Sequence, residues 1–512
     1  MITTFDGQMN RSPSVRTFRR SGQKAVVVGG GFGGIASALR LRALGYDVQI
    51  IDRQPCLGGR ARVFEKDGFT YDAGPTVVTA PFLFEELFNL FGQDMQDMVD
   101  LQALEPWYRI MFWDGKRFDY GGTVEDTLTE IDRFDPADRQ GYVQLLDMSR
   151  KIFDVGFTRL SDHPFLKFSD MIAQLPDLIK LKSFRSVFGL VSSYIKNPYL
   201  RQIFSVHPLL VGGNPFDTTS IYALIHYLER KWGVHYCMGG MGAMVAALGR
   251  LMERQGIQTR LGQTVTGLEV KANRISGAHL DDGSYLKGDL FVMNADAPFV
   301  YHYLLPSEHQ RWQTNWRLRQ LEFSMGLFVL YFGTDRQYKD IAHHTIWMGP
   351  RFKDLLKDIF HKKRLADDFS LYIHRPTATD ASMAPKGCDS FYVLSPVPNL
   401  QGKIDWSEVA DRYRDRIFET LEQHLIPDLR QHLVHSFYMT PVDFQNDYLS
   451  LWGSGFSIAP LLHQSAWFRF HNRDASIANL YFVGAGTHPG AGVPGVLSSA
   501  KVLQNVLTAD VI

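Results

Sequence analysis

Three glycines and one carboxylate are the residues whose types and spacing first indicate chemistry. Gly29, Gly31 and Gly34 form the pattern G-x-G-x-x-G, and Asp52 follows further along the chain. Gly29 permits a tight turn, Gly31 lets the backbone approach a pyrophosphate, and Gly34 lets a helix pack closely on a strand. A carboxylate such as Asp52 accepts hydrogen bonds from ribose hydroxyls. Together these residues predict a site for an adenine dinucleotide.

The elements around this pattern are those that such a site requires. An apolar run at 25–28 predicts a strand, and apolar residues at helical spacing from Ile35 to Leu44 predict a helix that ends at Gly45. A second strand, at 48–51, ends at Asp52. The helix N-terminus offers free N–H groups and its positive dipole end to phosphate. A glycine pattern alone also fits an ordinary turn, and the strand, helix and acid distinguish the two.

Composition excludes several classes of protein. The chain has 512 residues, a formal net charge of zero and 45% hydrophobic residues, so bulk electrostatics do not indicate nucleic acid as a partner. Cys56, Cys237 and Cys388 are too widely spaced for a disulfide framework or a metal motif, which fits a reducing, cytoplasmic compartment. Residues 1–22 carry arginines without an apolar core segment, so we expect a disordered basic tail and no secretory signal.

A second glycine-rich stretch lies near the C-terminus. Residues 480–500 contain no Asp, Glu, Lys or Arg, but they include five glycines together with Pro489 and Pro494. One continuous lipid-exposed helix is therefore excluded. An apolar strand, a turn through Gly484 and Gly486, and a helix at 496–506 fit the stretch better.

The remaining chain divides into alternating blocks. Residues 77–234 are dense in aromatic residues, with helices expected at 82–91, 140–153 and 178–195 and a hairpin turn at Asp114-Gly115. Strand patterns return after residue 235. We therefore predict an α/β fold, in which a discontinuous Rossmann-like domain takes residues 23–76, 235–298 and 475–512. A mixed α+β substrate domain takes 77–234 and 299–474. Its aromatic residues fit either a cavity for an apolar ligand or a well-filled core.

Further motifs carry a family resemblance. Gly58-Gly59-Arg60, followed by Asp72-Ala73-Gly74-Pro75 and the late glycine turn, resembles flavoproteins of the glutathione-reductase-like and amine-oxidase-like type. This favours FAD over NAD, and Arg53 leaves NADP open. The runs 68–76, 209–216 and 328–333, and above all 484–495, resemble bacterial-type phytoene desaturases, carotenoid oxidoreductases of the flavin amine-oxidase superfamily. Asp52 stands where that family often has Glu, and it serves the same hydrogen bonds.

The resemblance implies a reaction and a cofactor site. Phytoene would lose a hydride to FAD and a proton to a base, in repeated steps toward neurosporene or lycopene, and a quinone or oxygen would reoxidise the flavin. The residues expected to hold FAD are Gly29, Gly31, Phe32, Gly33, Gly34, Asp52, Arg53, Gly59, Arg60, Val265, Gly484, Gly486, Gly495 and Val496.

Three residues are candidates for the proton transfer. Asp170 stands in an apolar setting and matches an acidic position of the resembled family, although a helix cap would also explain it. His343 and His344 form a pair beside apolar strands, where structural histidines are the alternative. No metal-binding spacing stands out.

Two rival functions and one docking element complete the expectations. Another flavin oxidoreductase of this fold, such as a carotenoid isomerase, a retinol saturase or a protoporphyrinogen oxidase, is one alternative. A prenyl-binding escort protein without redox chemistry is the other. Because phytoene is nearly insoluble in water, we expect peripheral membrane association through a helix at 177–196. Its apolar face would comprise Phe184, Val187, Phe188, Val191 and Ile195, and packing of that face on the core is the alternative.

Overall fold

A five-stranded parallel sheet forms the first half of the molecule. The computed structural model describes residues 22–309, 316 and 318–509. In spatial order the strands are β19 (Leu480–Phe482), β13 (Leu290–Met293), β1 (Lys24–Val28), β2 (Asp47–Asp52) and β9 (Gln258–Leu261), with every pairing parallel. All five strands come from the segments 23–76, 235–298 and 475–512. The exact domain boundaries stay a prediction.

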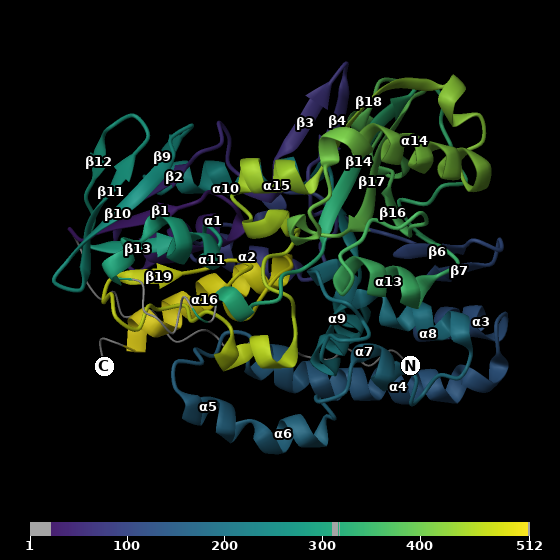
Figure 1. Cartoon of the computed structure of the whole chain (residues 1–512), viewed down its shortest axis with the longest axis horizontal. Helices are drawn as coiled ribbons and strands as arrows, with labels where there is room; N and C mark the ends of the chain where they lie inside the picture. The colour runs from purple at the N-terminus through teal and green to yellow at the C-terminus, as the bar shows by residue number, and fades with distance from the viewer. Residues whose placement is uncertain (1–21, 310–315, 317, 510–512) are drawn as a thin grey trace.

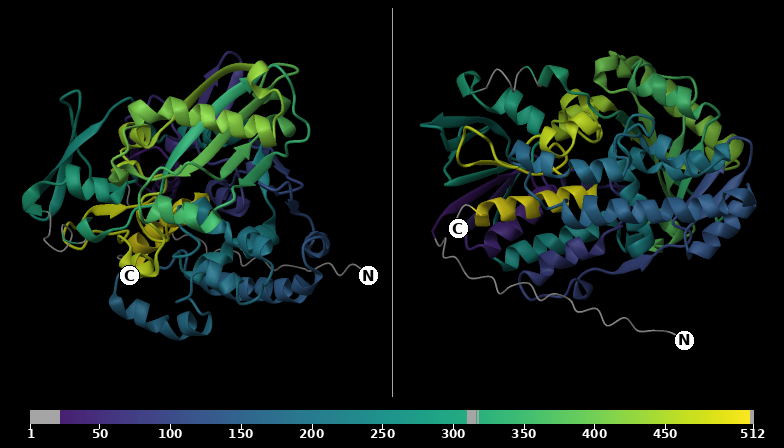
Figure 2. Two further views of the ribbon diagram at one scale, coloured as in Figure 1. Left: turned by 45° about the vertical axis from the view of Figure 1, so that its right-hand side comes forward. Right: turned by 90° about the horizontal axis from the view of Figure 1, so that it is seen from below.

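Helices cover one face of this sheet and a smaller sheet covers the other. The first face packs against α1 (Phe32–Ala43), α10 (Gly240–Arg254) and α16 (Val493–Ala509), which lie side by side in Figures 1 and 2. The second face packs against β10 (Val265–Lys271), β11 (Arg274–Leu280) and β12 (Tyr285–Leu286). The central strands read as near-continuous apolar runs because both faces are buried.

A seven-stranded mixed sheet forms the second half. Its spatial order is β18 (Leu433–Met439), β14 (Gly326–Thr334), β17 (Asp389–Val397), β16 (Leu371–His374), β15 (His344–Met348), β6 (Tyr108–Phe112) and β7 (Arg117–Tyr120). Only the pairing of β15 with β6 is parallel. The turn between β6 and β7 lies at the predicted Asp114-Gly115 hairpin. The helix α14 (Trp406–His424) packs on one face through its buried residues.

A layer of helices lies below the seven-stranded sheet in Figure 1. Two short strand pairs, β3 (Val63–Lys66) with β4 (Phe69–Asp72) and β5 (Leu101–Ala103) with β8 (His235–Cys237), join the two halves. The remaining helices are α2 (Pro81–Asn89), α3 (Val124–Asp132), α4 (Arg139–Phe153), α5 (Phe168–Ala173), α6 (Leu175–Lys180), α7 (Val187–Val191), α8 (Pro198–Ser205), α9 (Leu224–Trp232), α11 (Ala297–Phe299), α13 (Phe352–Phe360) and α15 (Pro441–Tyr448).

The prediction of one helix at 178–195 is wrong. The segment forms α6, a turn and then α7, which begins where the Ser186 hydroxyl accepts a hydrogen bond from the Gly189 N–H at 3.1 Å. Phe184 in the turn is 67% exposed, whereas Val187, Val191 and Ile195 are buried. The residues of the predicted apolar face therefore lie partly in solvent and partly in the core. A 3.6-residue period records apolar spacing but not which neighbour each residue packs against.

Two further expectations concern the ends and the membrane. The predicted tail, residues 1–22, lies outside the described residues except for Gly22. Among the described helices, none combines the length and the apolar character that crossing a bilayer demands.

Candidate active site

One cavity of about 590 Å³ runs between the two halves of the molecule. The loop after β1, the end of β2 and the residues that follow β13 and β19 line it on one side. Strands of the seven-stranded sheet and helices α6, α9 and α13 line it on the other. The first set is called the cofactor cradle below, and the second the substrate wall.

The glycine loop of the cradle is closely packed against backbone and side-chain atoms. An added Cβ on Gly34 would lie 1.9 Å from the Gly29 carbonyl oxygen, so only glycine lets α1 start this close to β1. Gly29 has φ +103°, a conformation that L side chains rarely adopt. A Cβ on Gly33 would lie 2.5 Å from Asn294 Oδ1. These contacts agree with the roles that the glycine pattern predicts.

Asp52 ends β2 with its carboxylate held by backbone. Its Oδ2 accepts a hydrogen bond from the Gly30 N–H at 2.5 Å, and its Oδ1 accepts one from the Gln54 N–H at 2.7 Å. Burial raises the pKa of Asp52, and these two hydrogen bonds oppose the rise. The residue thus joins the glycine loop to the strand end and also lines the cavity.

Two further polar side chains, Asp296 and Arg60, line the cavity beside the cradle. Asp296, two residues after Asn294, is half-buried, and its buried Oδ2 has no hydrogen-bond partner. The Arg60 guanidinium lines the cavity and donates to Ser450 Oγ at 2.6 Å. A helix N-terminus, a bare glycine loop, a strand-end acid and these groups fit a cofactor with phosphates, ribose and a polar ring system.

Twelve of the fourteen predicted cofactor residues line the cavity. The two exceptions are Gly34, which packs on Gly29, and Gly486, where an added Cβ would lie 2.7 Å from Asp296 Oδ1. Both glycines let segments beside the cradle approach each other more closely than a side chain would allow. Assignment of all fourteen to the cofactor stays a prediction.

The substrate wall is apolar with a single carboxylate among its described residues. It includes Leu228 on α9, Ile346 and Met348 on β15, and Phe352 on α13. The turn after α4, residues 154–159, is π-helical and adds Val155, Gly156 and Phe157. Asp52, Asp296 and Asp447, the other carboxylates that line the cavity, lie at the cofactor cradle. A wall of this kind suits an apolar ligand.

The single carboxylate of this wall is Glu229, which the sequence analysis did not single out. It is fully buried on α9. Tyr108 donates its hydroxyl to Oε1 at 3.0 Å, and His207 Nε2 lies 3.0 Å from Oε2. Nothing in the sequence around Glu229 distinguishes it from the surface charges of an amphipathic helix.

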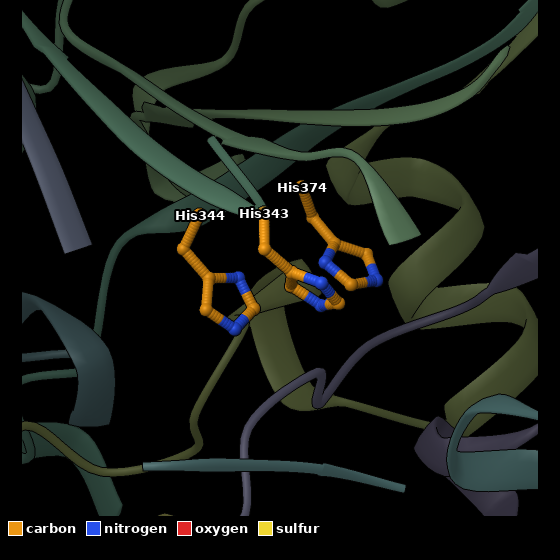
Figure 3. A group of neighbouring side chains, drawn as sticks. All are labelled: His343, His344 and His374. Atoms are coloured by element: carbon orange, nitrogen blue, oxygen red, sulfur yellow. The ribbon is translucent and has the colours of Figure 1, made fainter. Parts of the chain in front are cut away.

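The three predicted acid–base residues do not line the cavity. Asp170 lies in the first turn of α5, where its carboxylate accepts the Lys167 N–H at 3.0 Å. His343 and His344 are buried at the start of β15, with His374 of β16 beside them (Figure 3). Burial lowers the pKa of all three histidines. The catalytic roles of Asp170, His343 and His344 stay predictions.

A short hydrogen-bonded chain links His344 to the cavity. Its Nδ1 lies 2.7 Å from the Tyr372 hydroxyl, which lies 2.5 Å from Thr76 Oγ1. Tyr372 and Thr76 both line the cavity. Thr76 follows Gly74, where an added Cβ would lie 2.4 Å from the Arg60 carbonyl oxygen. The histidines therefore lie one side chain behind the junction of the cradle and the wall.

Comparisons with known proteins agree with this geometry. The family described as flavin containing amine oxidoreductase matches residues 32–502. The chain is 46% identical over 487 residues to a lycopene-forming phytoene desaturase of Pantoea ananas, which covers 95% of this chain and 99% of the relative. It is 42% identical over 488 residues to a neurosporene-forming phytoene desaturase of Cereibacter sphaeroides, which covers 94% of each.

The fold is also similar to a solved structure. The crystal structure of an oxidoreductase from Methanosarcina mazei has a TM-score of 0.63 at 16% identity, over 94% of this chain and 100% of that one. At that identity the likeness concerns the fold alone. The family and the fold confirm the predicted α/β architecture and the predicted FAD cofactor.

Proposed function

The chain belongs to the flavin containing amine oxidoreductases, and from that premise we propose that it desaturates phytoene to more conjugated carotenoids. The observation that carries this proposal is the continuity of the cavity. The polar cradle for a dinucleotide and the apolar substrate wall line one continuous cavity. A long hydrocarbon that must meet a flavin requires that combination. The relatives named above form lycopene or neurosporene, so either is the expected product.

Different residues bind the cofactor and orient the substrate. FAD, when bound, supplies the acceptance of a hydride from an allylic carbon. The glycine loop and Asp52 hold the dinucleotide, and Arg60 and Asp296 offer polar groups to its remaining part. Leu228, Ile346, Met348 and similar residues exclude water and orient the polyene. A quinone or oxygen would serve as the final electron acceptor.

Glu229 is the group best placed to receive the proton that leaves the neighbouring carbon. It is the carboxylate of the substrate wall, and its two oxygens retain free lone pairs beside the hydrogen bonds from Tyr108 and His207. The Tyr108 ring lies 5.8 Å from the His344 ring, which connects Glu229 to the junction with the cradle. An ionised carboxylate there also stabilises positive charge that develops on the polyene when the hydride leaves.

We propose membrane access through α5 and α6 rather than through the predicted helix. Met171 of α5, Leu178 of α6 and Gln174 between the two helices line the cavity. Their outer residues form an exposed apolar surface, the α5–α6 patch: Phe168, Ile172, Leu175, Ile179 and, in the following turn, Phe184. Lys167, Lys180 and Arg185 are exposed around it. The helices lie at the lower edge of the molecule in Figure 1 and in the left view of Figure 2. Exposed apolar groups with basic neighbours favour a bilayer surface.

Turnover of phytoene in liposomes tests the function. Purified holoenzyme should convert it to products with longer-wavelength absorbance, without added NAD, and the spectrum distinguishes neurosporene from lycopene. Under anaerobic conditions the flavin absorbance should bleach as the product forms. Isomerised but equally conjugated product would favour a carotenoid isomerase. Tight binding of a prenyl group without flavin bleaching would favour an escort protein.

A further inference from the structure

Three histidines from two neighbouring strands meet behind the substrate wall. His344 and His374 are paired residues of the antiparallel strands β15 and β16, so their side chains leave the sheet on the same face. His343 precedes the strand, and its ring turns against the His344 ring, with centroids 4.5 Å apart. Figure 3 shows the three rings side by side. Their distance in the sequence explains why spacing gives no sign of the cluster.

The cluster contains buried nitrogens that no protein group satisfies. The exposed fractions of His343, His344 and His374 are 5%, 0% and 1%. His343 Nε2, His344 Nε2 and both nitrogens of His374 have no hydrogen-bond partner. One nitrogen from each ring lies within 4.8 Å of the corresponding nitrogens of the other two. Buried polar atoms nearly always have a bonding partner, so we expect a bound ion or molecule to contact these nitrogens.

The outer contacts of the rings are those that metal ligands have. His343 Nδ1 lies 2.7 Å from Thr379 Oγ1, and His344 Nδ1 lies 2.7 Å from the Tyr372 hydroxyl. When these oxygens accept the Nδ1–H, the Nε2 of His343 and of His344 is left with a free lone pair. Such contacts fix the tautomer and the orientation of a ligating histidine.

One carboxyl group lies beside the cluster. Asp72 Oδ2 is buried without a hydrogen-bond partner and lies 3.8 Å from His374 Nε2. The nearby Arg375 is paired with Asp389, at 3.1 Å.

We propose that His343, His344 and His374 bind one divalent cation of the zinc class. Neutral imidazoles suit zinc, and bonds of about 2.0–2.1 Å would draw the three nitrogens to about 3.4 Å apart, a shift that side-chain rotation supplies. Asp72 or a water completes the coordination. The ion ties β15 to β16 and, through His344, fixes the Tyr372 hydroxyl at the cavity. A nitrogen bound to the ion accepts no proton, so this role differs from the acid–base role that the sequence predicts for His343 and His344.

Metal analysis of the purified holoprotein tests this without using phytoene or turnover. We expect about one zinc ion per chain by mass spectrometry. After removal by a chelator, added Co²⁺ should restore the occupancy and give the visible bands of a tetrahedral site. His374→Asn should lower the metal content at least about tenfold. His226→Asn, at a buried histidine of α9 outside the cluster, is the matched control and should retain the metal.

A ligand exchange keeps the test informative when His374→Asn folds poorly. His374→Cys should still bind Co²⁺ and add a thiolate-to-cobalt charge-transfer band, which only a direct ligand at this position produces. Metal-free wild-type protein that also fails to take up Co²⁺ would overturn the proposal and leave the cluster to ordered water. Unchanged cobalt spectra in the His374→Cys variant would overturn it as well.

Discussion

The cofactor cradle and the substrate wall differ in the groups that form them: mainly backbone groups in the cradle, and side chains in the wall. The cradle works mainly through backbone: glycines without side chains, a helix N-terminus, and an Asp52 carboxylate held by the Gly30 and Gln54 N–H groups. The wall works through side chains that strands and helices far apart in the sequence bring together, and Glu229 is its one carboxylate within the described part of the chain. A backbone site can be recognised from a short motif, whereas a side-chain site depends on the completed fold.

The largest expected effect comes from filling the cradle. Gly31→Val should abolish FAD binding, and with it all turnover, because a branched side chain would occupy space that the pyrophosphate needs. Gly31 has φ −74°, and an added Cβ would lie 3.1 Å from Asn294 Nδ2, so the variant should still fold. Flavin absorbance per chain and circular dichroism measure the two outcomes.

The control for this variant is a glycine in open space. An added Cβ on Gly267 of β10 would meet nothing within 4 Å, so Gly267→Val should keep its flavin. Full flavin absorbance in Gly31→Val would mean that the phosphate loop lies elsewhere, and the cradle would lose its defining feature.

The second effect tests the side-chain site. Glu229→Gln keeps the shape of the side chain but accepts a proton poorly, so the rate of flavin bleaching in an anaerobic single turnover should fall about 10²- to 10⁴-fold. FAD content should not change, because Glu229 lies outside the cradle. Glu86→Gln, at a carboxylate that pairs with Arg40 away from the cavity, is the matched control. A rate within about threefold of the wild type would remove Glu229 from the reaction.

The same contrast explains what the sequence predicts and what it misses. The order β1–α1–β2 follows from periodicity and glycine spacing alone, and so does the late strand, turn and helix around Gly484. Periodicity and spacing give no indication of the roles of Glu229 and His374. Glu229 becomes notable only because Tyr108 and His207, from other elements, reach it. His374 becomes notable only because strand register places it opposite His344.

The segment after α5 shows a different kind of failure. Phe184 and Val187 belong to one apolar helical face in the sequence, yet one is exposed and the other buried. Their spacing is compatible with a single helix, and the turn that begins at Lys182, with φ +55°, depends on contacts with distant residues. One of these is the hydrogen bond from the Val187 N–H to the Thr218 carbonyl oxygen.

The third effect extends the comparison to the outer side of the wall. Changing both Ile179 and Phe184, each 67% exposed, to Asp should weaken liposome binding about 100-fold or more, because each residue loses a buried apolar contact with lipid. Turnover of phytoene in liposomes should fall in parallel, whereas turnover of detergent-dispersed phytoene should persist. Folding should hold, since both side chains contact solvent in the free protein.

An exposed apolar residue elsewhere gives the control for this change. Val434 is 48% exposed on β18, a strand that lies at the top of the view in Figure 1, away from α5 and α6, and Val434→Asp should bind liposomes normally. Equal loss in both variants would indicate a general charge effect and would remove the α5–α6 patch from membrane access.

The smallest effect concerns His488, at the boundary between the cradle and the wall. The residue lines the cavity, and its Nε2 lies 3.1 Å from the Leu160 carbonyl oxygen, so it donates its N–H there. Burial lowers the pKa of His488 to about 3. Between that value and the unfolded pKa near 6.5, the unfolded chain binds the extra proton, so stability is present above pH 6.5 and is lost as the pH falls.

Replacing this histidine should therefore reduce the pH dependence of the free energy of unfolding. From pH 7 to pH 5 the protonation of unfolded His488 lowers the free energy of unfolding by about 2 kcal/mol. His488→Gln keeps an N–H donor for Leu160 but does not titrate, so its loss over this range should be smaller by that amount. Urea unfolding of both proteins at the two pH values measures the difference. An identical loss in both would mean that His488 is charged, or hydrated, in the folded protein, and the boundary would then be as polar as the cradle itself.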